Sequence, residues 1–195
     1  MNRFPSIHER RRQAPLHFWA KADNARFTAH ALWTLPDPGQ EKRARQINYN
    51  GNPAIATEEA FYREASVALE LIIKAVIAQR VEIGIAMRHV VKVRATHDLV
   101  SLWKDAQLPA LSSGDAHRLM IAKQTLYWAG RYAAPLKDED FEKEKSDMAS
   151  LEDRLPFGTS NIFIITPRSF SWEDFDRIYQ IAAESLSRMR EEADL

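Results

Sequence analysis

The chain has 195 residues, and its 27 Lys and Arg are balanced by 27 Asp and Glu. A hydrophobic fraction of 45% and a charged fraction of 28% exclude a wholly disordered chain and predict a globular domain with a substantial core. The sequence contains no cysteine, which excludes disulfide scaffolds, thiolate metal sites and cysteine nucleophiles, and only 6 Gly, which disfavours a glycine-looped nucleotide fold.

The charge is unevenly distributed along the chain. Residues 1–97 carry 15 Lys and Arg against 9 Asp and Glu, whereas residues 98–195 carry 12 against 18. This split favours a basic half that packs on an acidic half, so a surface for nucleic acid would have to be local. No apolar run approaches the ~20 residues needed to span a bilayer. We therefore expect no membrane segment and a cytoplasmic location.

The first fifteen residues are basic and offer little to bury, so residues 1–15 are predicted to form a mobile basic arm. Residues 16–195 are predicted to form a single helical-bundle domain. An amphipathic helix is expected from about Leu16 to Leu35, followed by a connection over residues 40–56. The large aromatic side chains expected on core-facing helix surfaces are Trp19, Phe27, Trp33 and Trp103.

The most apolar helix is predicted to begin at Thr57 and to run to about Gln79. Its polar residues form a narrow stripe, in which Glu70 and Lys74 have the four-residue spacing and the order that favour an ion pair. A helix with so thin a polar stripe is predicted to be the central element of a bundle. Two interpretations stay open for Glu70 and Lys74: polar residues of a cleft, or a solvated surface pair.

The second half of the chain predicts further helices. Thr96 is expected to cap a short helix, another is expected to start at Ser112, and a last one at Ser171. Residues 137–154 are predicted to be a solvated charged helix, and Asn161–Thr166 an apolar extended segment. The predicted fold class is therefore all-α, an up-and-down helical bundle of five or six helices.

The connector before the short helix holds the leading candidate site. Two cations, Lys92 and Arg94, lead into Thr96, His97 and Asp98 at the predicted helix start. Free backbone N–H groups and the positive end of a helix dipole suit a phosphate or a carboxylate, and a neutral imidazole at His97 suits general-base chemistry. In the competing interpretation, Thr96 caps the helix, Asp98 complements its dipole and the two cations are solvated.

Three segments carry a family resemblance: Ala68–Ala75 on the apolar helix, Thr96–Leu102 at the short helix, and Trp128–Tyr132 with Pro135. Together they resemble the HEPN superfamily, small helical bundles of prokaryotic toxin–antitoxin and defence systems. The resemblance implies an up-and-down four-helix core, homodimerisation, and either RNA cleavage or nucleotide-related binding. Arg131 in the third segment either binds an anion beside its aromatic neighbours or pins a helix end.

The chain departs from the nuclease members of that superfamily, which carry Arg and His four to six residues apart on a late helix. Arg12 and His17 have this spacing but lie around Pro15, which breaks helical geometry. Lys92 and His97 form a lysine variant before the short helix. No metal site or cofactor is expected, because the chain has neither a Glu-x-x-His pair nor a glycine-rich phosphate loop.

Three functions stay open from the sequence. The first is a HEPN-like bundle that forms a homodimer and binds a nucleotide, RNA or a partner protein. The second is a metal-independent ribonuclease of the toxin or defence type, with His97 as the catalytic candidate and the basic connector around it. The third is a structural interaction module without a reaction of its own.

Overall fold

The structure, a computed structural model, describes residues 6–11, 13–35, 37–85, 92–127, 139, 142, 146, 152–156, 163–167 and 170–193. The helices are α1 (Ile7–Arg11), α2 (Pro15–Trp33), α3 (Asp37–Gln46), α4 (Pro53–Glu82), α5 (Leu99–Asp105), α6 (Ser113–Tyr127) and α8 (Trp172–Ala193), and the strands are β1 (Glu152–Pro156) and β2 (Phe163–Pro167). The prediction of a helical bundle is confirmed, and a small hairpin is added to it.

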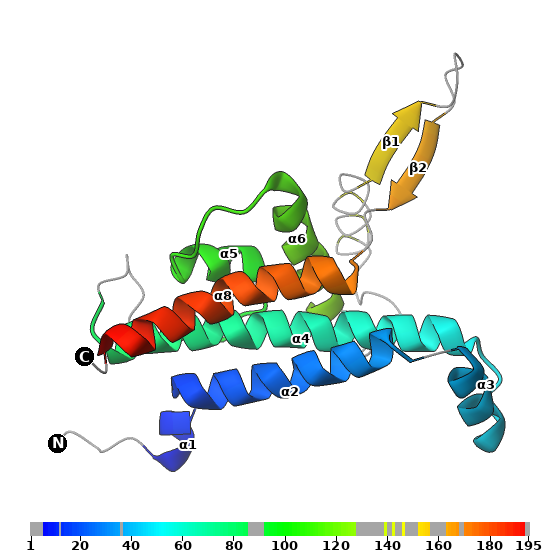
Figure 1. Cartoon of the computed structure of the whole chain (residues 1–195). Coiled ribbons are helices and arrows are strands. Elements are labelled where there is room, and N and C mark those ends of the chain that lie inside the picture. Colours follow the sequence, from blue (N-terminus) through cyan, green and yellow to red (C-terminus); the bar gives the residue numbers. More distant parts are fainter. Residues whose placement is uncertain are drawn as a thin grey trace.

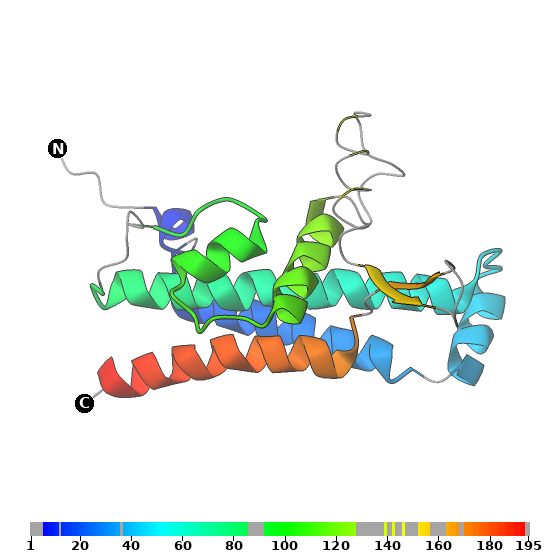
Figure 2. The same ribbon diagram turned by 90° about the horizontal axis from the view of Figure 1, so that it is seen from above.

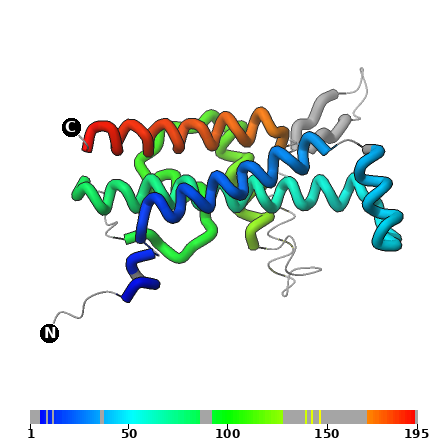
Figure 3. The backbone as a smooth tube through the Cα atoms, turned by 60° about the horizontal axis from the view of Figure 1, so that its bottom comes forward, coloured from blue at the N-terminus to red at the C-terminus, as the bar shows by residue number. Residues whose placement is uncertain are grey.

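Helix α4 is the centre of the bundle, as predicted, and packs against α2, α3, α5, α6 and α8. The three long helices α2, α4 and α8 lie side by side, with α4 antiparallel to α2 and parallel to α8 (Figure 1). Helices α5 and α6 cover another side of α4 (Figure 2). Helix α3 stands across the end of the bundle (Figure 3).

The core is built around the second half of α4, in which every residue from Ile72 to Gln79 is buried. Fully buried Leu and Ile side chains each contribute roughly 1.5–3 kcal/mol to folding, so this segment supplies much of the stability. Helix α2 meets it with small side chains, and the buried alanines of α2 are Ala22, Ala25 and Ala29.

The aromatic residues of α2 do not form its core face, which corrects the sequence prediction. Phe27 is 75% exposed and Trp33 is 45% exposed, so the prediction is wrong for these two, whereas Trp19 is half-buried and packs against the core. The alanine row brings α2 close to α4 and leaves no room for these rings between the helices. Trp103 is buried as predicted, and its indole N–H donates a hydrogen bond to the Pro109 carbonyl at 2.8 Å.

Helix α4 begins at Pro53 instead of the predicted Thr57. The Asn52 side-chain oxygen accepts hydrogen bonds from the backbone N–H groups of Ala54 and Ile55, at 2.9 and 3.4 Å. Proline fits the first helical position because its missing N–H would have no partner there. Asn52 therefore caps a helix that starts one turn earlier than the hydroxyl of Thr57 suggests.

Helix α4 also ends later than predicted, at Glu82 instead of Gln79. Gly84 follows with a φ of 73°, a left-handed conformation that glycine adopts without steric cost. The segment 40–56, predicted to be a connection, contains most of α3, because a proline in the first turn is compatible with a helix. The predicted starts at Ser112 and Ser171 are confirmed, since each hydroxyl accepts a hydrogen bond from an N–H three residues later.

Strands β1 and β2 pair antiparallel, with Asp153 opposite Thr166 and Leu155 opposite Ile164. The hairpin projects near the start of α8 (Figure 1). Residues 163–166 of the predicted extended segment lie in β2. The predicted solvated helix is wrong for residues 152–154, which lie in β1 because β2 supplies a partner for them. Most of the rest of that stretch lies outside the described residues.

The segment predicted to be a mobile basic arm contains helix α1. The Gln13 side-chain oxygen also accepts a hydrogen bond from the Val93 backbone N–H at 2.9 Å, which ties the end of the arm to the connector before α5. The mobility of the arm stays a prediction. Within the part of the chain that the structure describes, none of the helices combines the length and the apolar character needed to cross a membrane.

Candidate functional site

The connector that leads into α5 is organised by Asp98, which corrects the predicted cap. The Asp98 carboxylate accepts a hydrogen bond from the Ser101 backbone N–H at 3.1 Å, so Asp98 is the capping residue. The Thr96 hydroxyl instead accepts a hydrogen bond from the Asp98 N–H at 3.2 Å. His97 therefore lies before the helix and not at its first position, and its side chain is free to turn toward α4.

The structure brings Glu70, Lys74 and His97 together as a polar cluster. One carboxylate oxygen of Glu70 lies 2.5 Å from the Lys74 ammonium, and the other lies 2.8 Å from Nδ1 of His97. The side chains of Glu70 and Lys74 are each only 10% exposed, whereas that of His97 is 34% exposed. Glu70 and Lys74 are thus a buried pair that reaches a half-exposed imidazole, and not a solvated surface pair.

The polar cluster has the parts of an acid–base site. When Nδ1 of a neutral His97 donates to the Glu70 carboxylate, Nε2 is left as a proton acceptor. The carboxylate fixes the orientation of the imidazole, and the Lys74 ammonium balances the buried negative charge. The Tyr127 ring meets the imidazole edge to face, with 5.6 Å between ring centroids, and so limits how the imidazole can turn.

The other charged groups of the connector are paired with one another. Arg94 donates to the Ser101 hydroxyl at 2.6 Å and forms an ion pair with Asp105. Lys123 lies 3.3 Å from the Asp98 carboxylate. Burial opposes ionisation of Asp98, but hydrogen bonds from the Ser101 N–H and from Lys123 outweigh it and hold the pKa of this carboxyl below its usual value.

Two predicted site residues are not drawn into this arrangement. Lys92 is exposed and makes no ion pair within the described part of the chain. Arg131 lies outside the described residues, together with the rest of the third segment that resembles HEPN proteins. The geometry therefore unites Glu70, Lys74 and His97, with Arg94 and Asp98 nearby on the same connector.

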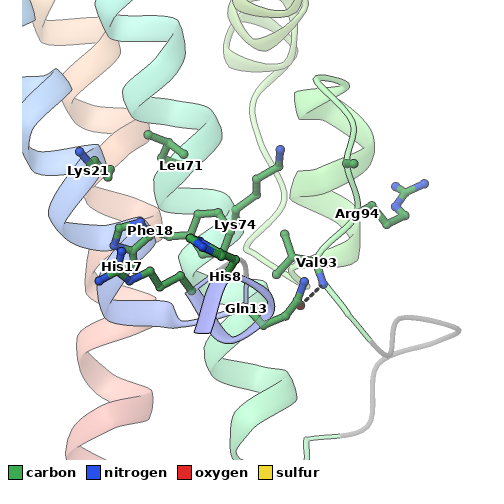
Figure 4. Close-up of a pocket in the computed structure, with 11 residues that line it drawn as sticks. His8, Gln13, His17, Phe18, Lys21, Leu71, Lys74, Val93 and Arg94 are labelled. Atoms are coloured by element: carbon green, nitrogen blue, oxygen red, sulfur yellow. Dashed lines mark hydrogen bonds between the residues drawn. The ribbon is translucent and has the colours of Figure 1, made fainter. Parts of the chain in front are cut away.

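A pocket of about 560 Å³ lies beside the polar cluster, between α1, α2, α4 and residues 93–95 (Figure 4). Lys74 and Arg94 line this basic pocket as well. Its other basic side chains are His8, Arg11, His17 and Lys21. Apolar side chains also line it, namely Phe18, Leu71 and Val93. No carboxylate is among the described residues that line it.

The cations of the basic pocket differ in whether they have partners. Lys74 and Arg94 are paired with Glu70 and Asp105, and their charged ends, like that of Lys21, point away from the middle of the pocket (Figure 4). Arg11 and Lys21 make no ion pair with any described residue. Two positive charges that no described carboxylate neutralises therefore border an apolar hollow.

Sequence reasoning missed the basic pocket. The only local signal is the spacing of His17 and Lys21, which are four residues apart and so share one face of α2. The sequence predicts an arm separate from the bundle, whereas the hydrogen bond between Gln13 and Val93, which ties the arm to the connector before α5, joins residues far apart in the sequence. The described residues contain no group of three or more His, Asp or Glu that could hold a metal ion.

Comparison with known proteins leaves the HEPN relationship as a prediction. No family model, curated protein or solved structure matches the chain. Function is therefore inferred from the geometry of the polar cluster and of the basic pocket.

Proposed function

We propose that this protein, as a HEPN-like bundle, binds a nucleotide in the basic pocket without a required metal ion. The observation that carries the proposal is the pair Arg11 and Lys21, two cations that have no partner among the described residues and that border a hollow lined by apolar side chains. The volume of about 560 Å³ lies within the usual range for small-molecule sites, roughly 300–1,000 Å³.

The pocket offers both kinds of contact that a nucleotide needs. Phe18 presents an aromatic ring, and Leu71 and Val93 present aliphatic surface, on which a base can stack or pack. Arg11 can bind a phosphate through two parallel hydrogen bonds, and Lys21 adds a point charge. An inorganic phosphate would use the cations alone, so we expect a nucleotide to bind more tightly.

The proposal is tested by calorimetric titration with ATP at about 0.15 M ionic strength, where attraction between exposed charges is screened beyond about 8 Å. In the double variant Arg11→Gln, Lys21→Gln, affinity should fall at least about tenfold, since hydrogen bonds to charged groups are worth about 1.5–3 kcal/mol each. The matched control is Lys42→Gln, Arg43→Gln on α3, which removes the same charge from exposed positions away from the pocket.

The control variant should bind ATP within about twofold of the parent protein, because long-range attraction between exposed charges is weak. Equal losses in both double variants would show that attraction is nonspecific and would contradict the proposal. So would an absence of ATP binding by the parent protein. Tight binding of single-stranded RNA without binding of ATP would favour the RNA alternative.

The second candidate function is metal-independent cleavage of RNA, and the polar cluster is the observation that favours it. Glu70 holds the His97 imidazole so that Nε2 could accept a proton from an attacking hydroxyl. RNA is incubated with the parent protein in excess chelator, and with His97→Ala and His30→Ala. Cleavage that persists in His30→Ala and is lost in His97→Ala supports this function. No cleavage by the parent protein contradicts it.

We also propose that the protein forms a homodimer, as the family resemblance implies. Large apolar side chains on the surface support this proposal, notably Phe27 and Ile47, which are 75% and 73% exposed. Burying such residues between two copies would remove apolar area from water. Light scattering at micromolar concentration should give twice the mass of the chain, and a monomeric mass would contradict the proposal. A role as a structural interaction module stays a prediction.

A further inference from the structure

Two of the side chains that line the basic pocket are imidazoles from different helices. His8 lies on α1 and His17 lies on α2, and both line the pocket near Phe18 (Figure 4). Both residues are exposed. Within the described part of the chain, neither imidazole is hydrogen-bonded or paired with a carboxylate.

Among the described residues, the charged groups that line the pocket around these imidazoles are all cationic. They are Arg11 on α1, Lys21 on α2, Lys74 on α4 and Arg94 on the connector. A phosphate in the pocket would bring in the negative charge that the described lining lacks. It would favour the protonated form of both imidazoles, because opposite charges attract most strongly where solvent is partly excluded.

We infer that phosphate binding in the basic pocket is coupled to protonation of His8 and His17. The inference rests on the proposed nucleotide binding, and it adds that pH regulates this binding. Imidazoles change charge between about pH 5 and 8, so the affinity for a phosphate should rise as the pH falls through this range. Because linkage is reciprocal, the protein should take up protons as the ligand binds.

Other histidines of the described chain provide a contrast. Nδ1 of His97 donates to the Glu70 carboxylate, and the His30 ring packs edge to face on Trp172, with 4.6 Å between centroids. Neither lines the basic pocket. His30 lies on the same helix as His17 and is also exposed, which makes it the matched control for the loss of one imidazole.

The experiment uses ADP-ribose, whose pyrophosphate keeps its two negative charges throughout this pH range, so that only the protein titrates. The dissociation constant is measured at low salt at about pH 5.5 and about pH 8. Proton uptake is obtained near pH 6.5 from the binding enthalpy in two buffers that differ in their heat of ionisation. We expect binding to be about five- to tenfold tighter at the lower pH, as for two partly exposed ion pairs.

The double variant His8→Asn, His17→Asn should bind ADP-ribose at about pH 8 within about twofold of the parent protein, but should lose both the pH dependence and the proton uptake. Since both positions are exposed, the fold should tolerate these changes. His30→Asn should keep both properties.

The outcomes separate this inference from the proposal on which it rests. Binding of equal strength at both pH values, or a pH dependence that survives in the double variant, would overturn the coupling and leave nucleotide binding intact. An absence of ADP-ribose binding at either pH would overturn both. The inference is supported if the parent protein and His30→Asn take up protons on binding and the double variant does not.

Discussion

Two groups of charged side chains in this bundle differ in whether they have partners. In the α6–α8 network, Asp115 pairs with Arg118 and Arg177 at 3.3 and 2.5 Å, and Asp174 pairs with the same two arginines at 2.8 Å each. In the basic pocket, no described residue forms an ion pair with Arg11 or Lys21. The paired charges join two helices, whereas Arg11 and Lys21 are the charges that the proposed function assigns to a ligand.

The α6–α8 network also stabilises the buried charge of Asp115. Asp115 is only 5% exposed, and burial opposes its ionisation. Hydrogen bonds from Arg177 and from Ser112, together with the charge of Arg118, outweigh that penalty and hold the pKa of the Asp115 carboxyl below its usual value. The ionised carboxyl is thus satisfied inside the protein, and no ligand is needed to explain it.

The largest effect is expected where a buried pair is broken. Glu70→Ala leaves the Lys74 ammonium buried without its partner and should lower the free energy of unfolding by about 3 kcal/mol. Glu59→Ala on the exposed face of α4 should change it by less than about 0.5 kcal/mol. Urea denaturation measures both. Equal costs would show that the polar cluster does not hold the fold.

A smaller loss is expected in the α6–α8 network. Asp115→Asn removes the charge that two arginines share and should cost about 2 kcal/mol, less than the full penalty for a buried pair because Arg177 is half-exposed and can be hydrated. Glu184→Gln, an exposed position on α8, is the control and should stay within about 0.5 kcal/mol of the parent protein. A cost for Asp115→Asn no larger than the control would refute the structural role of the network.

The same carboxyl predicts how stability depends on pH. Because the native pKa of Asp115 lies below its unfolded value, its contribution is fully present above about pH 4 and is lost as the pH falls through the native pKa. Asp98 acts in the same direction. The melting temperature of the parent protein should therefore drop below about pH 4, and Asp115→Asn should flatten this drop. A parallel drop in both proteins would assign the acid sensitivity to other groups.

Substitutions in the connector before α5 should lower the stability of the protein less than those in the α6–α8 network. Asp98→Ala removes the capping carboxylate and should cost about 1 kcal/mol in urea denaturation. Thr96→Ala removes only the acceptor of the Asp98 N–H and should cost about half as much. The opposite order would restore Thr96 as the residue that caps the helix.

The smallest effect on folding is expected in the basic pocket itself. Arg11→Gln with Lys21→Gln breaks no pair among the described residues and should change the stability of the free protein by less than about 0.5 kcal/mol. Saturating ATP should raise the melting temperature of the parent protein and leave that of the variant almost unchanged. A large loss of stability without ATP would mean that these cations serve the fold.

Local patterns in the sequence predicted some features and missed others for identifiable reasons. The thin polar stripe of α4 correctly placed that helix at the centre, and it drew attention to Glu70 and Lys74. It could not show that His97 reaches Glu70, because that contact joins residues 27 positions apart through the packing of the connector on α4. On α2, the aromatic rings suggested the wrong face, since close helix packing selected the alanines.

The cap of α5 and the basic pocket show the same limit. Thr96 and Asp98 are both good capping residues, and the sequence alone does not decide which of them faces the free N–H groups. The basic pocket depends on α1 lying beside α2 and α4, which no periodicity within the arm predicts. Contacts within one helix could be predicted, whereas contacts between distant segments required the structure.

We propose that Arg11 and Lys21, which have no partner among the described residues, mark the ligand site and that the α6–α8 network does not. This proposal is tested by recording backbone amide NMR spectra of the parent protein during titration with ATP. We expect shifts concentrated at His8, Arg11, His17 and Lys21 and at residues 93–95, with little change at Asp115 or Arg177. Shifts centred on the α6–α8 network, or no shifts at all, would contradict it.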